Sequence, residues 1–195
     1  MVPLEFAPCG SWFVIFREAA TAHPATVAGN MPVDANSPKR KPVQEISGAW
    51  TVHFDPKWGG PKTAQFDSLA NWNRRSEPGI RFYSGTAVYE KTFDLSQSAI
   101  LLDLGGVREL AEVKVNGQSC GVIWCAPWRV NVTGVVKPGA NKLQIKVVNC
   151  WPNRLIGDAA LPQEQRLTRT NVRKITQKTP LLKSGLLGPV RLLRL

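Results

Sequence analysis

The sequence lacks the features that mark several large functional classes. No apolar run approaches the roughly 20 residues that a membrane helix requires. Histidine occurs only at His23 and His53, so a Ser/His/Asp triad is poorly supplied. The glycine pairs Gly59-Gly60 and Gly105-Gly106 are not followed by the Lys-Ser or Lys-Thr of a phosphate-binding loop. There is no helix-turn-helix, zinc-finger or RNA-recognition signature, so we expect no nucleic acid as partner. The lack of a long apolar run likewise predicts no membrane as partner.

Cysteine is scarce and its spacing does not indicate a metal site. The four cysteines are Cys9, Cys120, Cys125 and Cys150. Cys120 and Cys125 lack the C-x2-C spacing of a metal site, and on one shared strand their side chains would point to opposite faces. We expect buried thiols and no metal ligands. A disulfide from Cys150 to either of the other two remains open if the protein is exported.

Acidic residues are also few, and the imbalance is concentrated near the C-terminus. Lys and Arg number 25 against 14 Asp and Glu, which gives a net charge of +11. From Gln163 onward Glu164 is the single acid, and the bases are Arg166, Arg169, Arg173, Lys174, Lys178, Lys183, Arg191 and Arg194. Because these basic residues are interleaved with Leu, Thr and Gln, we expect them to lie on a solvated face of the domain. Binding of an anionic glycan or of an acidic neighbouring domain is the alternative.

The first 47 residues differ from the rest of the chain. Residues 1–18 contain a β-prone run, 11–17, and are predicted to be the terminal strand of a preceding domain. Residues 19–47 are rich in Ala, Pro, Asn and Ser and are predicted to be a linker or long loop. Residues 48–195 then form the main domain. The apolar patch 12–16 is too short for a signal-peptide core, so we expect no targeting signal in this chain.

Residues 48–195 show the pattern of short strands separated by turns. Trp50 begins a strand and is expected in the core, and Gly85–Leu95 alternates as a half-buried strand does. The Asn116-Gly117 dipeptide predicts a type I′ turn that joins strands near 110–115 and 119–125. A closing strand over Pro189–Leu195 is expected at a sheet edge because of its proline. No amphipathic helix stands out, and we predict an all-β antiparallel jelly-roll sandwich.

Several segments resemble a known family. The segments 84–93, 102–105 and 111–117, continued by 128–133 and 137–143, resemble the sugar-binding jelly roll of glycoside hydrolase family 2. The flanking segments 54–61, 151–158 and 182–190 resemble the C-terminal sandwich of large bacterial α-L-rhamnosidases of the glycoside hydrolase family 106 type.

This resemblance implies a galactose-binding-like fold and an accessory role. In such enzymes the catalytic carboxylates lie on a separate barrel, so we expect the chain not to be catalytic alone. The expected partners are a glycan and the catalytic domain of a parent hydrolase, which would be periplasmic or secreted in a bacterium. No cofactor is required, although related jelly rolls hold calcium in a loop, and calcium therefore remains possible.

The candidate binding groups are aromatic and planar polar side chains, because sugars stack their C–H faces on rings and offer hydroxyls to polar partners. The candidates for carbohydrate binding are Trp124, Trp128, Arg129, Trp151, Asn153, Arg154 and Asp158. The last three are expected in a polar loop after a strand. In the structural alternative, Arg129 pairs with Asp158 and fixes that loop.

Three hypotheses follow from these residues. A binding module predicts an exposed Trp beside Asn, Asp or Arg in a concave patch. A domain that only docks on the catalytic barrel predicts a flat apolar patch instead. A self-sufficient glycosidase requires two neighbouring carboxylates among Glu90, Asp103, Glu109 and Glu112. Because strand carboxylates that alternate with apolar residues normally face solvent, we assign no catalytic residue.

Overall fold

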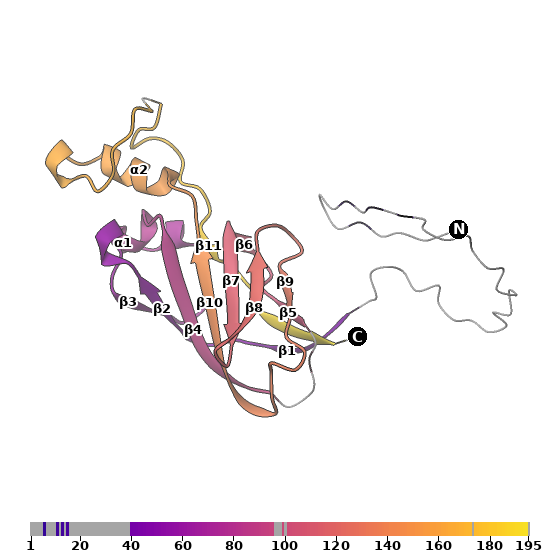
Figure 1. Cartoon of the computed structure of the whole chain (residues 1–195). Helices are drawn as coiled ribbons and strands as arrows, with labels where there is room; N and C mark the ends of the chain where they lie inside the picture. Colours follow the sequence, from indigo (N-terminus) through magenta and orange to yellow (C-terminus); the bar gives the residue numbers. More distant parts are fainter. Residues whose placement is uncertain are drawn as a thin grey trace, which may run out of the picture.

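A computed structural model describes residues 40–95, 99, 101–172 and 174–194, together with the isolated positions 6, 11, 13 and 15. These residues form antiparallel sheets, with short helices gathered at one end (Figure 1). The predicted all-β sandwich is therefore confirmed. Within the described ranges, no helix is long and apolar enough to cross a membrane.

The larger sheet is antiparallel and has six strands. In spatial order these are β3 (Thr63–Phe66), β2 (Trp50–Phe54), β4 (Thr86–Leu95), β10 (Gly139–Val148), β7 (Leu110–Val115) and β8 (Gln118–Ile123). The two long strands β4 and β10 pair over ten residues each and form the centre of this sheet.

The smaller sheet has four antiparallel strands, and a short two-stranded ladder stands beside the two sheets. The four strands are β1 (Lys41–Glu45), β12 (Arg191–Arg194), β5 (Leu101–Asp103) and β9 (Arg129–Asn131), in that order, and the ladder pairs β11 (Gly185–Leu186) with β6 (Val107–Arg108). The closing strand β12 lies between β1 and β5, so its predicted edge position is wrong. Pro189 precedes the strand, and its missing N–H therefore removes no ladder hydrogen bond.

The domain boundary also differs from the prediction. Residues 41–45 pair with β12, and Ile46 is buried, so the sandwich begins before residue 48. The part of the predicted linker from Lys41 onward is therefore a strand and its connection. The predicted strand over 1–18 lies, apart from four isolated positions, outside the described residues, as does the linker up to residue 39.

The hairpin predicted from Asn116-Gly117 is confirmed. Strand β7 pairs with β8, and the two turn residues have φ values of 52° and 82°. Both values lie in the left-handed region that a type I′ turn requires, which Asn and Gly adopt at least cost.

Alternating side chains of the central strands form the core. In β10 the residues Leu143, Ile145 and Val147 are fully buried, as expected from their alternation with polar residues. Around Tyr89 of β4 lies a group of buried aromatic rings that includes Trp50, as predicted for the core. The Tyr89 hydroxyl accepts a hydrogen bond from the Trp72 indole N–H (2.6 Å) and another from the Leu186 amide (3.2 Å).

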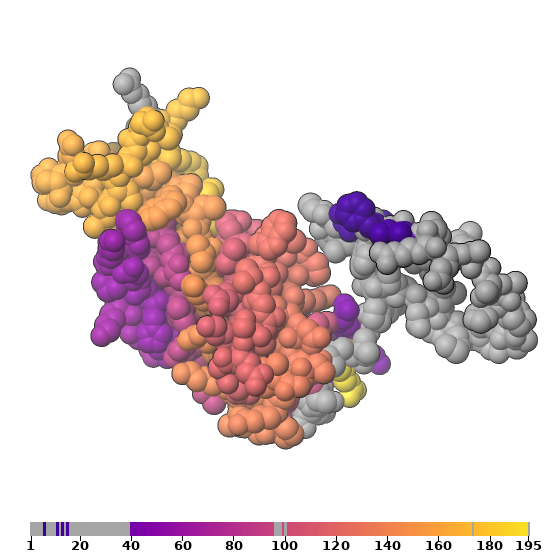
Figure 2. All heavy atoms as spheres, viewed as in Figure 1, coloured from indigo at the N-terminus to yellow at the C-terminus, as the bar shows by residue number. Residues whose placement is uncertain are grey.

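Short helices connect the strands at the end of the sandwich where α2 lies. They are η1 (Pro56–Trp58), η2 (Trp72–Arg74), α1 (Pro78–Arg81), α2 (Pro152–Ala159) and η3 (Gln163–Gln165). Helix α2 and the long segment that follows it gather over this end of the sandwich (Figure 2). This segment returns to the sheets at β11, so it is held at both ends.

Candidate functional site

An aromatic groove lies where η1 approaches α2. Trp58 is the last residue of η1, and Trp151 immediately precedes α2. Their ring centroids are 4.8 Å apart at an interplanar angle of 77°, an edge-to-face contact. Trp58 is half-buried, whereas Trp151 is 44% exposed. The pair therefore presents a fixed aromatic surface to solvent.

The groove is completed by the segment that returns from α2. With the two tryptophans, Leu155 and the residues 167–170 line an open cavity of about 400 Å³. The segment packs closely against Gly59, the residue that follows η1. A Cβ atom at this glycine would lie only 2.7 Å from Leu167 Cδ1, so a larger residue would not fit there without a shift. Beside the rings lie the Arg169 side chain and the threonines 168 and 170. Aromatic faces beside a guanidinium and hydroxyls match the mixed apolar and polar surface of a sugar ring.

The polar loop predicted for Asn153, Arg154 and Asp158 is instead the helix α2, where all three residues are buried. The Asn153 amide donates to the Leu182 carbonyl (2.9 Å), and its Oδ1 accepts from the Leu182 amide (2.8 Å). The backbone amide of Arg154 donates to Ser84 Oγ (3.0 Å). These contacts tie the helix to the returning segment and to the sandwich, and they leave Asn153 occupied by structural hydrogen bonds.

The expected pairing of Arg129 with Asp158 is wrong. Arg154 is the partner of Asp158, with 3.0 Å between Nη2 and Oδ1 across one helical turn. The other carboxylate oxygen of Asp158 accepts hydrogen bonds from the amide and the hydroxyl of Thr168. Arg129 instead donates to Asp103 Oδ2 (2.7 Å) between β9 and β5. Asp158 thus fixes the segment 167–170, which carries Arg169 and the two threonines of the groove.

The other two tryptophan candidates lie outside the groove. Trp128 is partly buried and packs against the core, which leaves little of its ring for a ligand. Trp124 follows β8 and is 73% exposed, and the nearby Val122 is 56% exposed. Trp124 therefore presents a separate apolar surface at the edge of the larger sheet.

Three of the four carboxylates considered for catalysis lie against basic side chains. Glu90 lies on β4 near Lys142 and His53, at 3.7 Å from each. Glu112 lies on β7, and its contact with Lys146 on β10 holds the pKa of that carboxyl below its usual value. Asp103 binds Arg129 on the other sheet, and Glu109 is exposed between two strands. Glycoside hydrolysis needs two carboxyl groups held about 5–10 Å apart around one bond. Here Asp103 lies on the smaller sheet, Glu90 and Glu112 lie on the larger one, and each of these three is occupied by a basic partner.

The three described cysteines differ from the expectation of buried thiols. Cys120, Cys125 and Cys150 are free thiols, so the disulfides left open among them are absent from the described chain. Of these three, only Cys120 is partly buried, so the expected burial of all the thiols is wrong for the other two. Within those same ranges no three His, Cys, Asp or Glu side chains cluster to hold a metal ion. Calcium binding stays a prediction without assigned ligands.

Sequence reasoning identified Trp151 but missed the rest of the groove. Trp58 lies in the segment 54–61 that carried the family resemblance, yet no role was assigned to it. Arg169 was counted among the basic residues of a solvated face. One local signal of helix α2 was the spacing of Arg154 and Asp158, since oppositely charged residues four apart can stabilise a helix.

The two packed antiparallel sheets are those of a galactose-binding-like β-sandwich. The family model described as "Glycosyl hydrolase 2 galactose-binding domain-like" matches residues 72–179, and the chain belongs to this family. The solved structure of a rhamnosidase from Novosphingobium sp. PP1Y is similar over 80% of this chain, with 36% identity and a TM-score of 0.76. A protein of Formosa agariphila that is named as a beta-glucuronidase is 38% identical over 75% of the chain. The chain spans 15% of the length of each of these two proteins.

Proposed function

We propose that this chain is an accessory module of an α-L-rhamnosidase-like glycoside hydrolase and that it holds a glycan in the Trp58–Trp151 groove. The observation that carries the proposal is the exposed Trp151 in a concave patch beside Arg169. A pyranose ring stacked on Trp151 would place its hydroxyls near the guanidinium and the two threonines. Membership of the galactose-binding-like family and the likeness to a rhamnosidase support the hydrolase context.

Catalysis would then belong to another part of a longer protein. The relatives are about seven times longer than the matched part, since the chain spans 15% of each. Glu90, Asp103 and Glu112 each lie against a basic side chain, which argues against a self-sufficient glycosidase. The module would hold substrate near the active-site rim of its parent, which we expect to be exported to the periplasm or beyond.

A docking role has a separate basis in the structure. Trp124 and Val122 are exposed at the β8 edge of the larger sheet, away from the groove residues. An exposed aromatic beside an aliphatic side chain is typical of a contact surface between domains. We therefore assign Trp124 to contact with the catalytic domain of the parent and Trp151 to the glycan.

The two assignments can be separated by titration of the full chain with oligosaccharides, rhamnose-containing plant cell-wall fragments among them. The readout is a saturable change in tryptophan fluorescence, followed for the unsubstituted chain and for the Trp151→Ala and Trp124→Ala variants. Both residues are exposed, so the two substitutions should leave the fold intact. The glycan proposal requires that Trp151→Ala abolish the change and that Trp124→Ala preserve it. A folded protein that binds no glycan of the panel would reject it and leave docking as the function.

A further inference from the structure

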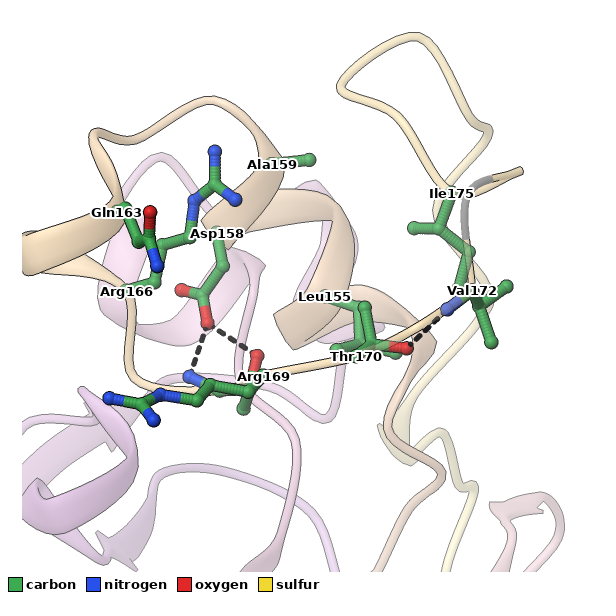
Figure 3. Close-up of a pocket in the computed structure, with 10 residues that line it drawn as sticks. Leu155, Asp158, Ala159, Gln163, Arg166, Arg169, Thr170, Val172 and Ile175 are labelled. Carbon is green, nitrogen blue, oxygen red and sulfur yellow. Dashed lines mark hydrogen bonds between the residues drawn. The ribbon is translucent and has the colours of Figure 1, made fainter.

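A second cavity lies directly behind the aromatic groove. It has a volume of about 320 Å³ and is lined by α2 and, from the segment that follows, by Gln163, Arg166, Val172, Ile175 and the residues 168–170. The groove and this cavity share Leu155 and the residues 168–170, so they adjoin one another along this segment. In Figure 3 the side chains of Arg166 and Arg169 lie on either side of Asp158. A ligand seated on the tryptophans could therefore extend into a pocket of different chemistry.

The charge of this cavity is positive despite its aspartate. The Asp158 carboxylate is buried, is paired with Arg154 and accepts two hydrogen bonds from Thr168. Arg166 uses Nε to donate to the Leu161 carbonyl (2.9 Å), and Arg169 is exposed. In the part of the chain that the structure describes, no carboxylate lies within 4 Å of either guanidinium. Two arginine charges thus remain without an acidic partner at the wall of the cavity.

Arginine binds planar carboxylates through two parallel hydrogen bonds. We infer that this cavity is a subsite for the carboxylate of a uronic acid residue within the bound glycan. The inference rests on the proposed glycan groove, because the ligand must present a sugar ring to Trp151 and an acid group to Arg166 or Arg169. A sulfate ester is another anionic group that sugars carry, and a guanidinium can also bind it through two hydrogen bonds, so the test includes a sulfated ligand.

The test compares trisaccharides that differ only in the acid group. Glucuronate- and galacturonate-containing trisaccharides are titrated into the full chain beside their carboxyl-reduced forms and a sulfated neutral trisaccharide. Arg166→Gln/Arg169→Gln removes the two guanidinium groups. Lys178→Gln is the matched control, because Lys178 is an exposed base of the same segment outside the cavity lining. Circular dichroism checks that both variants remain folded.

We expect a uronate ligand to bind about tenfold more tightly than its reduced form, as charge-assisted hydrogen bonds in a partly exposed site allow. The double arginine variant should lose this difference and bind both forms equally, more weakly than the unsubstituted chain binds the reduced form, because Arg169 also lines the groove. Lys178→Gln should keep the difference. Equal affinity for acid and reduced forms, with fluorescence still dependent on Trp151, would overturn the subsite and leave the glycan groove intact. Stronger binding of the sulfated ligand would overturn the carboxylate assignment, and the absence of all binding would reject both proposals.

Discussion

Replacement of Asp158 by asparagine tests whether one buried ion pair holds the candidate site in place. The substitution keeps the shape of the side chain and removes its charge, so Arg154 is left buried without its counter-ion. The side chains of Arg154 and Asp158 are only 8% and 4% exposed. Removal of one partner from a buried pair costs about 3–5 kcal/mol. Asp158 Oδ1 lacks a well-aligned hydrogen bond, which favours the lower half of that range.

Urea unfolding followed by circular dichroism measures this cost, with Glu164→Gln as the control. Glu164 is an exposed acid of the same segment, so the control removes the same charge and should change the free energy of unfolding by no more than about 0.5 kcal/mol. In a cycle with Arg154→Met, the second substitution should cost at least about 1 kcal/mol less when the first is present. Unchanged stability of Asp158→Asn, or strictly additive costs, would refute the role of the pair.

Three further predictions concern the core and the thiols. Tyr89→Phe should destabilise the fold by about 2–4 kcal/mol in thermal unfolding, because two buried N–H donors lose their acceptor; a loss below about 0.5 kcal/mol would contradict this. Gly185→Ala should destabilise far more than Gly134→Ala, because both have positive φ but only Gly185 has a tryptophan ring in the space of a Cβ; equal losses would show that backbone strain alone decides. Burial raises the pKa of Cys120, so at pH 8 it should react with iodoacetamide more slowly than the exposed Cys125 in peptide mass spectrometry, and equal rates would contradict this.

Local patterns predicted the strands well, because buried and exposed side chains alternate along a strand that has one buried face. The alternation in β10 and the Asn116-Gly117 turn each depend on neighbours in the sequence, and both were confirmed. The order of the strands depends on contacts between distant segments. The position of β12 between β1 and β5 could not be predicted from Pro189, since the proline stands outside the ladder and restricts neither edge of the strand.

The polar residues of α2 were misassigned for a different physical reason. Asn, Arg and Asp in a short segment normally indicate exposure, since burial of such groups is costly without partners. Here the partners are supplied by distant parts of the chain, such as Ser84 and the backbone of Leu182. Local composition cannot predict which distant carbonyl or hydroxyl will satisfy a buried amide. Pro152 at the start of the helix was a second signal beside the Arg154–Asp158 spacing, since proline favours the first helical turn.

The same distinction between buried and exposed charge determines what the site can bind. Counted along the sequence, Arg154, Arg166 and Arg169 are equivalent positive charges, and Asp158 would neutralise any one of them. In the structure Asp158 lies next to Arg154 inside the protein, so that pair contributes rigidity and little net field. The charges of Arg166 and Arg169 therefore remain at the cavity wall beside the tryptophan groove. If the buried pair were exchanged so that Asp158 met Arg169 instead, the groove would keep its aromatic surface, and only Arg166 would remain at the cavity wall for the acid group of a sugar.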